Sequence, residues 1–108
     1  MSEISYQDFT KISLKVGKII SAEIIPDSNK LLKLQIDIDG VSKQCISGIR
    51  GPYSPTDLES KLVAVLTNLK PRKILGFESQ VMLLAAVNDS DISLIIPDKT
   101  IPVGSDIS

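Results

Sequence analysis

The sequence predicts an all-β fold, a small five-stranded barrel with a short helical insert and a C-terminal extension, on three observations. Five segments have the alternating or continuously apolar pattern of β-strands. Gly17 interrupts the first and longest of them, as glycine does where a strand bends or bulges. One segment, SPTDLE at 54–59, has a helix start, with Ser54 as the cap and Pro55 at the first helical position. A closed or nearly closed barrel is the economical way to give these strands one core.

The strands follow one another with turns between them. The predicted strands lie within residues 10–26, 32–39, 41–47, 62–69 and 81–87. Gly40 joins the second and third as a hairpin. After Asn88 come two short extended pieces and a disordered tip, and no second helix is expected. This count fits an OB-fold barrel at about 9–87 with an extension at 88–108, within a single domain spanning 1–108.

Composition argues against an enzyme. The 108 residues include no histidine and one cysteine, Cys45, so the commonest general base and the commonest nitrogen ligand of zinc are both missing. Cys45 lies on an apolar strand face and is predicted to be a core residue. We therefore expect no catalytic residues, no metal and no cofactor. No apolar run approaches the roughly 20 residues of a membrane helix, no export signal is present and a lone cysteine fits a reducing compartment, which predicts a cytoplasmic protein without a membrane partner.

The segment NLKPRKILGFES, Asn68–Ser79, concentrates positive charge on a chain whose net charge is −1. Residues 60–73 hold four basic residues and no acid. Such a patch can bind phosphate although the whole chain is near neutral; the alternative interpretation is a solvated connecting loop. Aromatic residues are few and absent from the second and third β-strands. This disfavours a protein that binds single-stranded nucleic acid by stacking bases on aromatic rings. The pattern favours folded RNA as the ligand, because proteins recognise folded RNA by its shape and its backbone.

Several segments together resemble a known family. PDSNKLLKLQIDIDG, QCISGI, Tyr53, NLKPRK and ESQVMLLAA, in this order and spacing, resemble the tRNA-binding domain. That OB-fold module is appended to many methionyl-tRNA synthetases, exists as a free-standing homodimeric tRNA-binding protein, and recurs in a cofactor of eukaryotic synthetase complexes. The secretion chaperone CsaA shares the fold. The resemblance covers about residues 9–97.

The resemblance implies a set of tRNA-binding residues, matched position by position: Lys30, Ser47, Asn68, Lys70, Arg72, Lys73, Ser79 and Met82. Pro71 fixes its own φ and biases Lys70 toward extended geometry. Ser79 would offer a hydroxyl and Met82 an apolar surface, although Met82 could equally be a core residue. Ser47 would bond RNA or only cap its turn, and the Asn68 side chain is expected to hydrogen-bond its own loop.

Two positions depart from the family pattern. Val81 replaces a common glycine beside the predicted site, which puts close approach of RNA there in question. Asn29 replaces a common aspartate and removes one negative charge.

The predicted function is non-catalytic binding of folded tRNA, specific for structure and not for the anticodon, in trans to a methionyl-tRNA synthetase as a separate β subunit. A CsaA-type export chaperone that binds unfolded polypeptide is the alternative, and a fragment of a larger synthetase is a third interpretation. The partners are tRNA and an aminoacyl-tRNA synthetase. The apolar segments ISLIIP and TIPVG would pair with a second copy, which predicts a homodimer.

Overall fold

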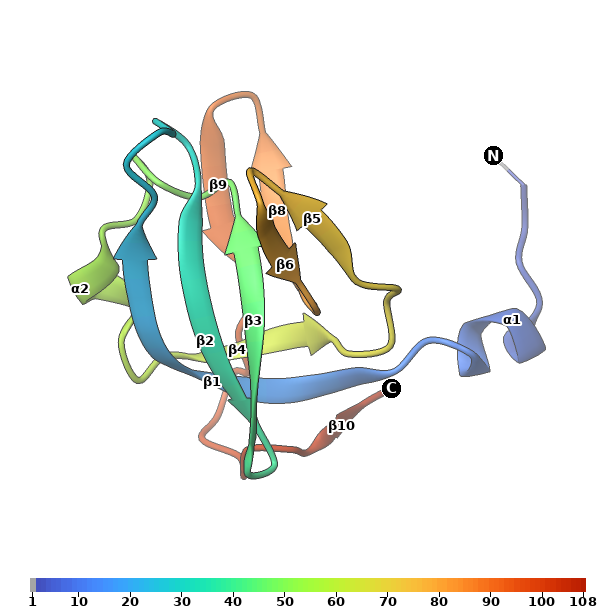
Figure 1. Ribbon diagram of the computed structural model, residues 1–108. Helices are drawn as coiled ribbons and strands as arrows, with labels where there is room; N and C mark the ends of the chain where they lie inside the picture. The colour runs from blue at the N-terminus through green and yellow to red at the C-terminus, as the bar shows by residue number, and fades with distance from the viewer. Residues whose placement is uncertain (1) are drawn as a thin grey trace.

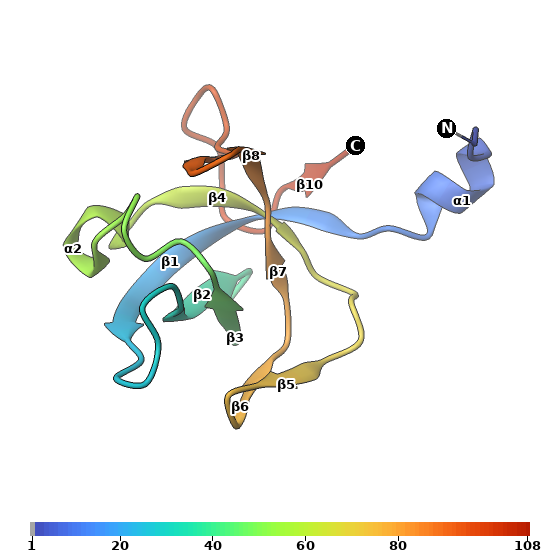
Figure 2. The same ribbon diagram turned by 90° about the horizontal axis from the view of Figure 1, so that it is seen from above.

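The computed structural model describes residues 2–108 and is dominated by short antiparallel strands (Figure 1). In chain order the elements are α1 (Tyr6–Thr10), β1 (Leu14–Ile24), β2 (Leu32–Ile38), β3 (Val41–Ser47), α2 (Pro55–Leu58), β4 (Leu62–Leu66), β5 (Arg72–Ile74), β6 (Phe77–Ser79), β7 (Met82–Leu83), β8 (Ala85–Asn88), β9 (Asp91–Leu94) and β10 (Asp106–Ile107). The main sheet has the order β3-β2-β1-β4-β7, and β10 pairs with β1. Figures 1 and 2 show this sheet curling on itself. The predicted all-β, OB-like barrel is confirmed.

Strand β1 connects the two halves of the curled sheet. Its first residues pair with β4 and its last with β2, and Lys18 pairs with both Leu62 and Asp37. The register against β2 shifts between Ile19 and Ser21, which is the geometry of a β-bulge and adds local twist. A long first strand that changes partner in its middle is what allows one sheet to close into a barrel.

Gly17 was predicted to mark a bend in the first strand. The structure shows that glycine is needed at this position because the chain is closely packed across the sheet. A Cβ built on Gly17 would lie 2.6 Å from Cγ2 of Ile36 and 3.1 Å from Cγ2 of Val65. Both neighbours are fully buried. Position 17 requires glycine because two core side chains occupy the space that a side chain there would take. The bulge itself follows three residues later.

The core fills the inside of this barrel. In β2 alternate residues from Leu32 to Ile38 are buried, as the period of two predicts. The predicted helical turn is confirmed as α2: the backbone N–H of Ser54 donates to a carboxylate oxygen of Asp57 at 3.1 Å, and Leu58 enters the core.

Cys45 is a core residue, as the sequence predicted. Its side chain is 1% exposed, and this burial raises the pKa of the thiol, an effect larger than the opposing hydrogen bonds to Leu83 and Ser79. Because the thiolate is the reactive form, a raised pKa makes this cysteine inert at neutral pH.

The barrel is closed by a contact between Gln44–Ile46 of β3 and Ser79–Gln80, called here the β3 seam. The N–H of Gln80 donates to the carbonyl of Gln44 at 2.8 Å. The N–H of Gln44 donates to Oε1 of Gln80 at 2.9 Å, and the N–H of Ile46 donates to Oγ of Ser79 at 3.0 Å. Two of these three bonds end on side-chain oxygens, so the seam differs from an ordinary ladder between strands.

Several sequence-based boundaries are wrong. The connection predicted at 68–79 contains a hairpin, β5–β6. The predicted fifth strand at 81–87 is broken at Leu84, whose N–H donates to the Ala64 carbonyl while its own carbonyl accepts from Ile95. The chain leaves β4 at this point, and β8 then pairs with β9. The predicted fourth strand ends at Leu66 instead of residue 69.

Two further elements, α1 and β10, were not predicted from the sequence. The five-residue α1 was not expected from the sequence, and none of its residues is buried. The C-terminal residues form β10, which pairs with β1, where a disordered tip was predicted. Within residues 2–108 no helix is long and apolar enough to cross a membrane.

Candidate nucleic-acid interface

The β5–β6 hairpin carries the basic segment. Lys70 precedes β5, Arg72 and Lys73 lie within it, and all three side chains are exposed. Among residues 2–108, none of the three takes part in an ion pair. The three cations therefore stand on an ordered hairpin, with Arg72 opposite Ser79 and Lys73 opposite Glu78 in its register, and their charge is available to a ligand.

Asn68 holds the base of this segment. Its side-chain Oδ1 accepts from the N–H of Ser13 at 2.9 Å, and its Nδ2 donates to the carbonyl of Lys11 at 2.6 Å. Both polar atoms are thus committed to the protein's own backbone. The sequence predicted that this side chain would hydrogen-bond its own loop. That partner is wrong, because both bonds go to the segment before β1.

A cavity of about 190 Å³ brings four of the predicted residues together: Ser47, Arg72, Ser79 and Met82. Met82 is 49% exposed, so the interpretation of Met82 as a core residue is wrong. Val81 is 3% exposed and belongs to the buried part of the wall. Its side chain contributes to the lining of this cavity, so its effect on the approach of RNA stays a prediction.

Ser79 has a structural task at this cavity. It is 9% exposed, its Oγ accepts from the N–H of Ile46 in the β3 seam, and the same hydroxyl donates to the Val81 carbonyl at 3.4 Å. Its hydrogen-bonding capacity is largely used inside the protein. The RNA contact that the family resemblance implies for Ser79 stays a prediction.

Lys30 lies apart from the first cavity. It lines a second one, of about 440 Å³, together with Gly48 and Arg50. Arg50 fixes the turn that carries Lys30: its N–H donates to the Lys30 carbonyl at 3.0 Å, and its Nη1 donates to the Ser28 carbonyl at 2.5 Å. Sequence reasoning missed Arg50, although a base between two glycines in GIRG was a visible signal.

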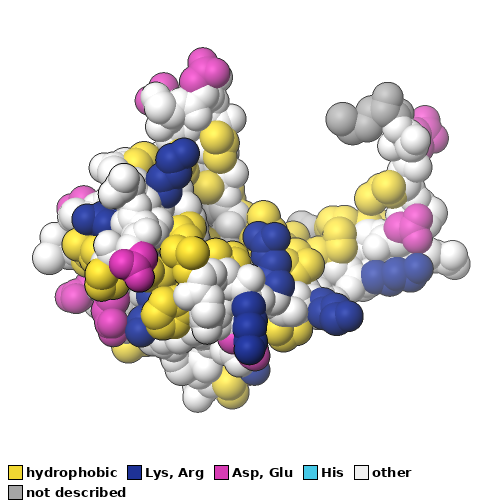
Figure 3. All heavy atoms as spheres, turned by 45° about the horizontal axis from the view of Figure 1, so that its top comes forward, with side chains coloured by type: hydrophobic (Ala, Val, Ile, Leu, Met, Phe, Trp, Pro, Cys, Tyr) yellow, Lys and Arg dark blue, Asp and Glu magenta, His cyan; other side chains and the backbone are white. Residues whose placement is uncertain are grey.

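Sequence reasoning also did not identify Leu69 as a residue of the candidate interface. Leu69 lines the first cavity beside Met82 and is exposed. Figure 3 shows Lys and Arg side chains standing next to hydrophobic ones on one face of the molecule. A surface of this kind suits a ligand that has both charged and flat apolar parts, as a nucleotide does.

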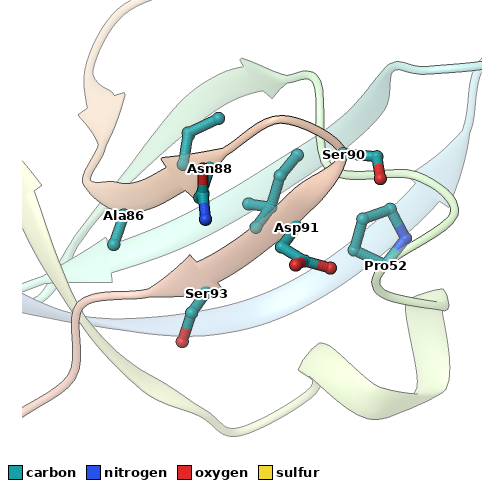
Figure 4. A pocket seen from close by; sticks show the side chains of 8 residues that line it. Pro52, Ala86, Asn88, Ser90, Asp91 and Ser93 are labelled. Atoms are coloured by element: carbon teal, nitrogen blue, oxygen red, sulfur yellow. The ribbon is translucent and has the colours of Figure 1, made fainter.

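A third cavity is not part of this interface. It measures about 690 Å³ and lies between Pro52 and the β8–β9 hairpin (Figure 4). It is lined by no Lys or Arg, and Asp91 contributes a carboxylate. Phosphate would be repelled there. In the described part of the chain no group of three or more His, Cys, Asp or Glu side chains could hold a metal ion.

Comparison with known proteins identifies the family of this chain. A family model described as "Putative tRNA binding domain" matches residues 14–106. Methionine–tRNA ligase of Methanococcus aeolicus is 48% identical over 107 residues, which are 99% of this chain and 16% of that enzyme. The Thermotoga maritima enzyme is 42% identical over 97% of this chain and 17% of its own length. The chain thus spans about a sixth of the length of these curated relatives.

Two solved structures share the fold over almost the whole chain. A "MetRS related protein" from Pyrococcus horikoshii has a TM-score of 0.93 at 34% identity and covers 100% of both chains. The chaperone CsaA from Bacillus anthracis has a TM-score of 0.89 at 29% identity, over 99% of this chain and 100% of that one. The family model covers far more than half of the sequence, and relatives above 40% identity agree with it. The chain therefore belongs to the tRNA-binding domain family.

Proposed function

We propose that this chain is a non-catalytic module that binds folded tRNA through its shape and phosphates, without reading the anticodon. The observation that carries the proposal is the cavity lined by Ser47, Arg72, Ser79 and Met82, with Lys70 and Lys73 exposed on the same hairpin. Arg72 offers a planar fork to phosphate, whereas the lysines act as mobile point charges. Backbone contacts of this kind give affinity without sequence reading.

The positions of the aromatic residues favour folded RNA over single-stranded nucleic acid as the ligand. Tyr6 and Phe9 lie on α1, Tyr53 packs against the core, and Phe77 lies under the ammonium of Lys33, 5.0 Å from the ring centroid. Strands β2 and β3 carry no aromatic residue. Proteins that hold single strands present several stacking rings along their strands, so the cations of this chain are better suited to a preformed RNA shape.

We further propose that the module acts in the cytoplasm, in trans to a methionyl-tRNA synthetase. Its relatives are methionine–tRNA ligases, and a solved structure described as a MetRS related protein has the same fold, which supports a working relation to that enzyme. A second binding module raises the effective concentration of tRNA at the enzyme. This is how a domain with no catalytic group would assist aminoacylation.

A second copy of the chain would cover the apolar surface at the two ends. Ile95, Ile96 and Ile101 are exposed and line a cavity of about 390 Å³. On α1, Tyr6 and Phe9 line another of about 380 Å³, and the helix stands away from the barrel (Figure 1). Exposed apolar surface that is contiguous over several elements marks an interaction site. We propose a homodimer formed by these terminal segments, residues 88–108 among them.

The homodimer predicts a specific sedimentation result. At micromolar concentration the chain is expected to sediment as a dimer of the 11.7 kDa unit, because pairing removes these side chains from water. Replacing Ile95 and Ile96 with aspartate should give a folded monomer, since both side chains are exposed in the single chain. Analytical ultracentrifugation that finds only the 11.7 kDa species in the unmodified protein would contradict the interface.

A chaperone role is the second candidate. The CsaA structures from Bacillus anthracis and Picrophilus torridus share this fold at 29% identity, and the apolar lining by Leu69 and Met82 could accept an apolar side chain of an unfolded polypeptide. The unpaired cations beside it favour RNA instead, because a polypeptide does not carry regularly spaced negative charge.

A competition experiment separates the two candidates. In filter binding, total tRNA is expected to be retained by the protein, and binding should weaken steeply as salt rises, because phosphate contacts release counterions. An unfolded, carboxymethylated polypeptide of similar charge serves as the competitor. Failure of tRNA to bind, together with retention of the polypeptide, would replace the proposed function with the chaperone role.

A further inference from the structure

Gly48 is the point at which two cavities meet. It lines the 190 Å³ cavity with Arg72 and Met82, and it also lines the 440 Å³ cavity with Lys30 and Arg50. It follows directly after β3 and is exposed. We refer to the two cavities, together with the exposed backbone of Gly48 that borders both, as the groove.

The fold itself does not require glycine at this position. The φ of Gly48 lies outside the left-handed range, in contrast to Gly40 and Gly76. A Cβ built on it would meet no atom within 4 Å, whereas one built on Gly17 would collide with the core. A glycine that serves neither a turn nor close packing is typical of a site where a ligand approaches the backbone closely.

The charges along the groove are arranged for a ligand with phosphates at two separate points. Arg72 lines the first cavity, and Lys30 and Arg50 line the second. Asp89 also lines the second cavity and would repel a phosphate placed against it. An anionic ligand would therefore lie along the Lys30 side and cross at Gly48 to reach Arg72.

The first cavity is suited to one base. Leu69 and Met82, both exposed and apolar, flank it. Its volume of about 190 Å³ is below the roughly 300–1,000 Å³ of pockets that enclose a whole small-molecule ligand, so it fits a single flat group that projects from a larger molecule. A base inside an RNA helix is stacked and paired, and only an unpaired base can be turned out into a protein pocket.

We propose that one strand of the bound tRNA crosses the bare backbone at Gly48, with phosphates held by Arg72 on one side and by Lys30 and Arg50 on the other. An unpaired base of that strand enters the cavity between Leu69 and Met82. This inference rests on the proposed tRNA-binding function and adds to it the route of the RNA and the kind of nucleotide that it must present.

The groove can be blocked at Gly48 without touching a cation. Gly48→Leu is expected to keep the circular dichroism spectrum and melting temperature of the wild type, because the added side chain points into open space. It should weaken tRNA binding roughly tenfold, the scale of one lost base contact. Ser42→Leu adds the same side chain at an exposed position near the other end of β3 and should bind tRNA as the wild type does. Lys30→Ala should reduce the slope of log K against log salt by roughly 0.7–0.9.

Each alternative outcome has one meaning. If Gly48→Leu binds tRNA like the wild type while Arg72→Ala binds more weakly, the route across Gly48 is wrong and the tRNA-binding function stands. If Gly48→Leu loses only the binding of carboxymethylated polypeptide, the groove is a polypeptide site and the proposed route is again wrong. If the wild type itself does not bind tRNA, the proposed function fails and the route fails with it.

Discussion

Replacing Lys70, Arg72 and Lys73 together with alanine is expected to weaken binding of all tRNAs by a similar factor and to flatten its dependence on salt. The three side chains are exposed on the β5–β6 hairpin, and each would contact one phosphate. A hydrogen bond to a charged group contributes about 1.5–3 kcal/mol, so losing three should reduce affinity by roughly a thousandfold or more at ~0.1 M salt. The slope of log K against log salt should fall by roughly two to three, because each contact contributes about 0.7–0.9.

The measurement is filter binding over a salt series, with circular dichroism to verify folding. Exposed substitutions of this kind change the free energy of unfolding by only about ±0.5 kcal/mol. A charge-matched control replaces Lys18, Lys61 and Lys99, which line neither cavity of the groove. A folded hairpin variant that binds tRNA as tightly as the wild type at the same salt would show that the hairpin is not the site. Arg72→Lys alone should also weaken tRNA binding, because the planar guanidinium, which can donate two hydrogen bonds to one phosphate, is replaced by an ammonium that acts as a point charge.

Gly17→Ala is expected to lower the free energy of unfolding by about 1–2 kcal/mol. The new Cβ would lie 2.6 Å from Cγ2 of Ile36, and Ile36 is fully buried and branched at Cβ, so it cannot move aside without disturbing the core. Overpacking of this kind costs about 1–3 kcal/mol. Alanine also restricts the unfolded chain, which raises the free energy of unfolding by about 0.4–1 kcal/mol. The clash is the larger of the two effects.

Urea unfolding of Gly17→Ala beside Gly48→Ala tests this prediction. The two variants make the same chemical change, and the alanine at 48 meets no atom within 4 Å. Only the effect on the unfolded chain then applies, so the stability of Gly48→Ala should equal that of the wild type or exceed it by up to about 1 kcal/mol. For a domain of this size, 1 kcal/mol corresponds to a shift of the melting temperature by about 4–8 °C. Equal stability of the two alanine variants would refute the account of Gly17.

Sequence reasoning worked best where local and overall structure agree. The limits of β2 and β3 fall within one residue of those predicted, because alternation is strict and the turn between them uses Asp39 and Gly40 at φ 54° and 86°, as a two-residue hairpin turn requires. The β5–β6 hairpin was missed because its turn is Leu75-Gly76, with Leu75 at φ 49°. Leucine seldom adopts this conformation, so the sequence carries no ordinary turn signal.

Some features of the candidate site could likewise be predicted from the sequence, and others could not. Family resemblance identified four residues that line one cavity, because their spacing along the chain is recognisable. It could not show that the hydroxyl of Ser79 is used by Ile46, 33 residues away, because that bond exists only when the barrel closes. Gly48 was passed over for a related reason: its position between two cavities depends on elements from four separate parts of the chain.

The β3 seam makes the attachment of the basic hairpin measurable by hydrogen exchange. The amides of Gln44 and Ile46 donate to side-chain oxygens of Gln80 and Ser79, so they become free when the hairpin segment detaches, even while the rest of the barrel stays folded. Local opening of this kind needs less free energy than global unfolding. These two amides therefore report how firmly the hairpin is held, and a ligand that binds the hairpin together with the barrel would slow their exchange without changing that of the core amides.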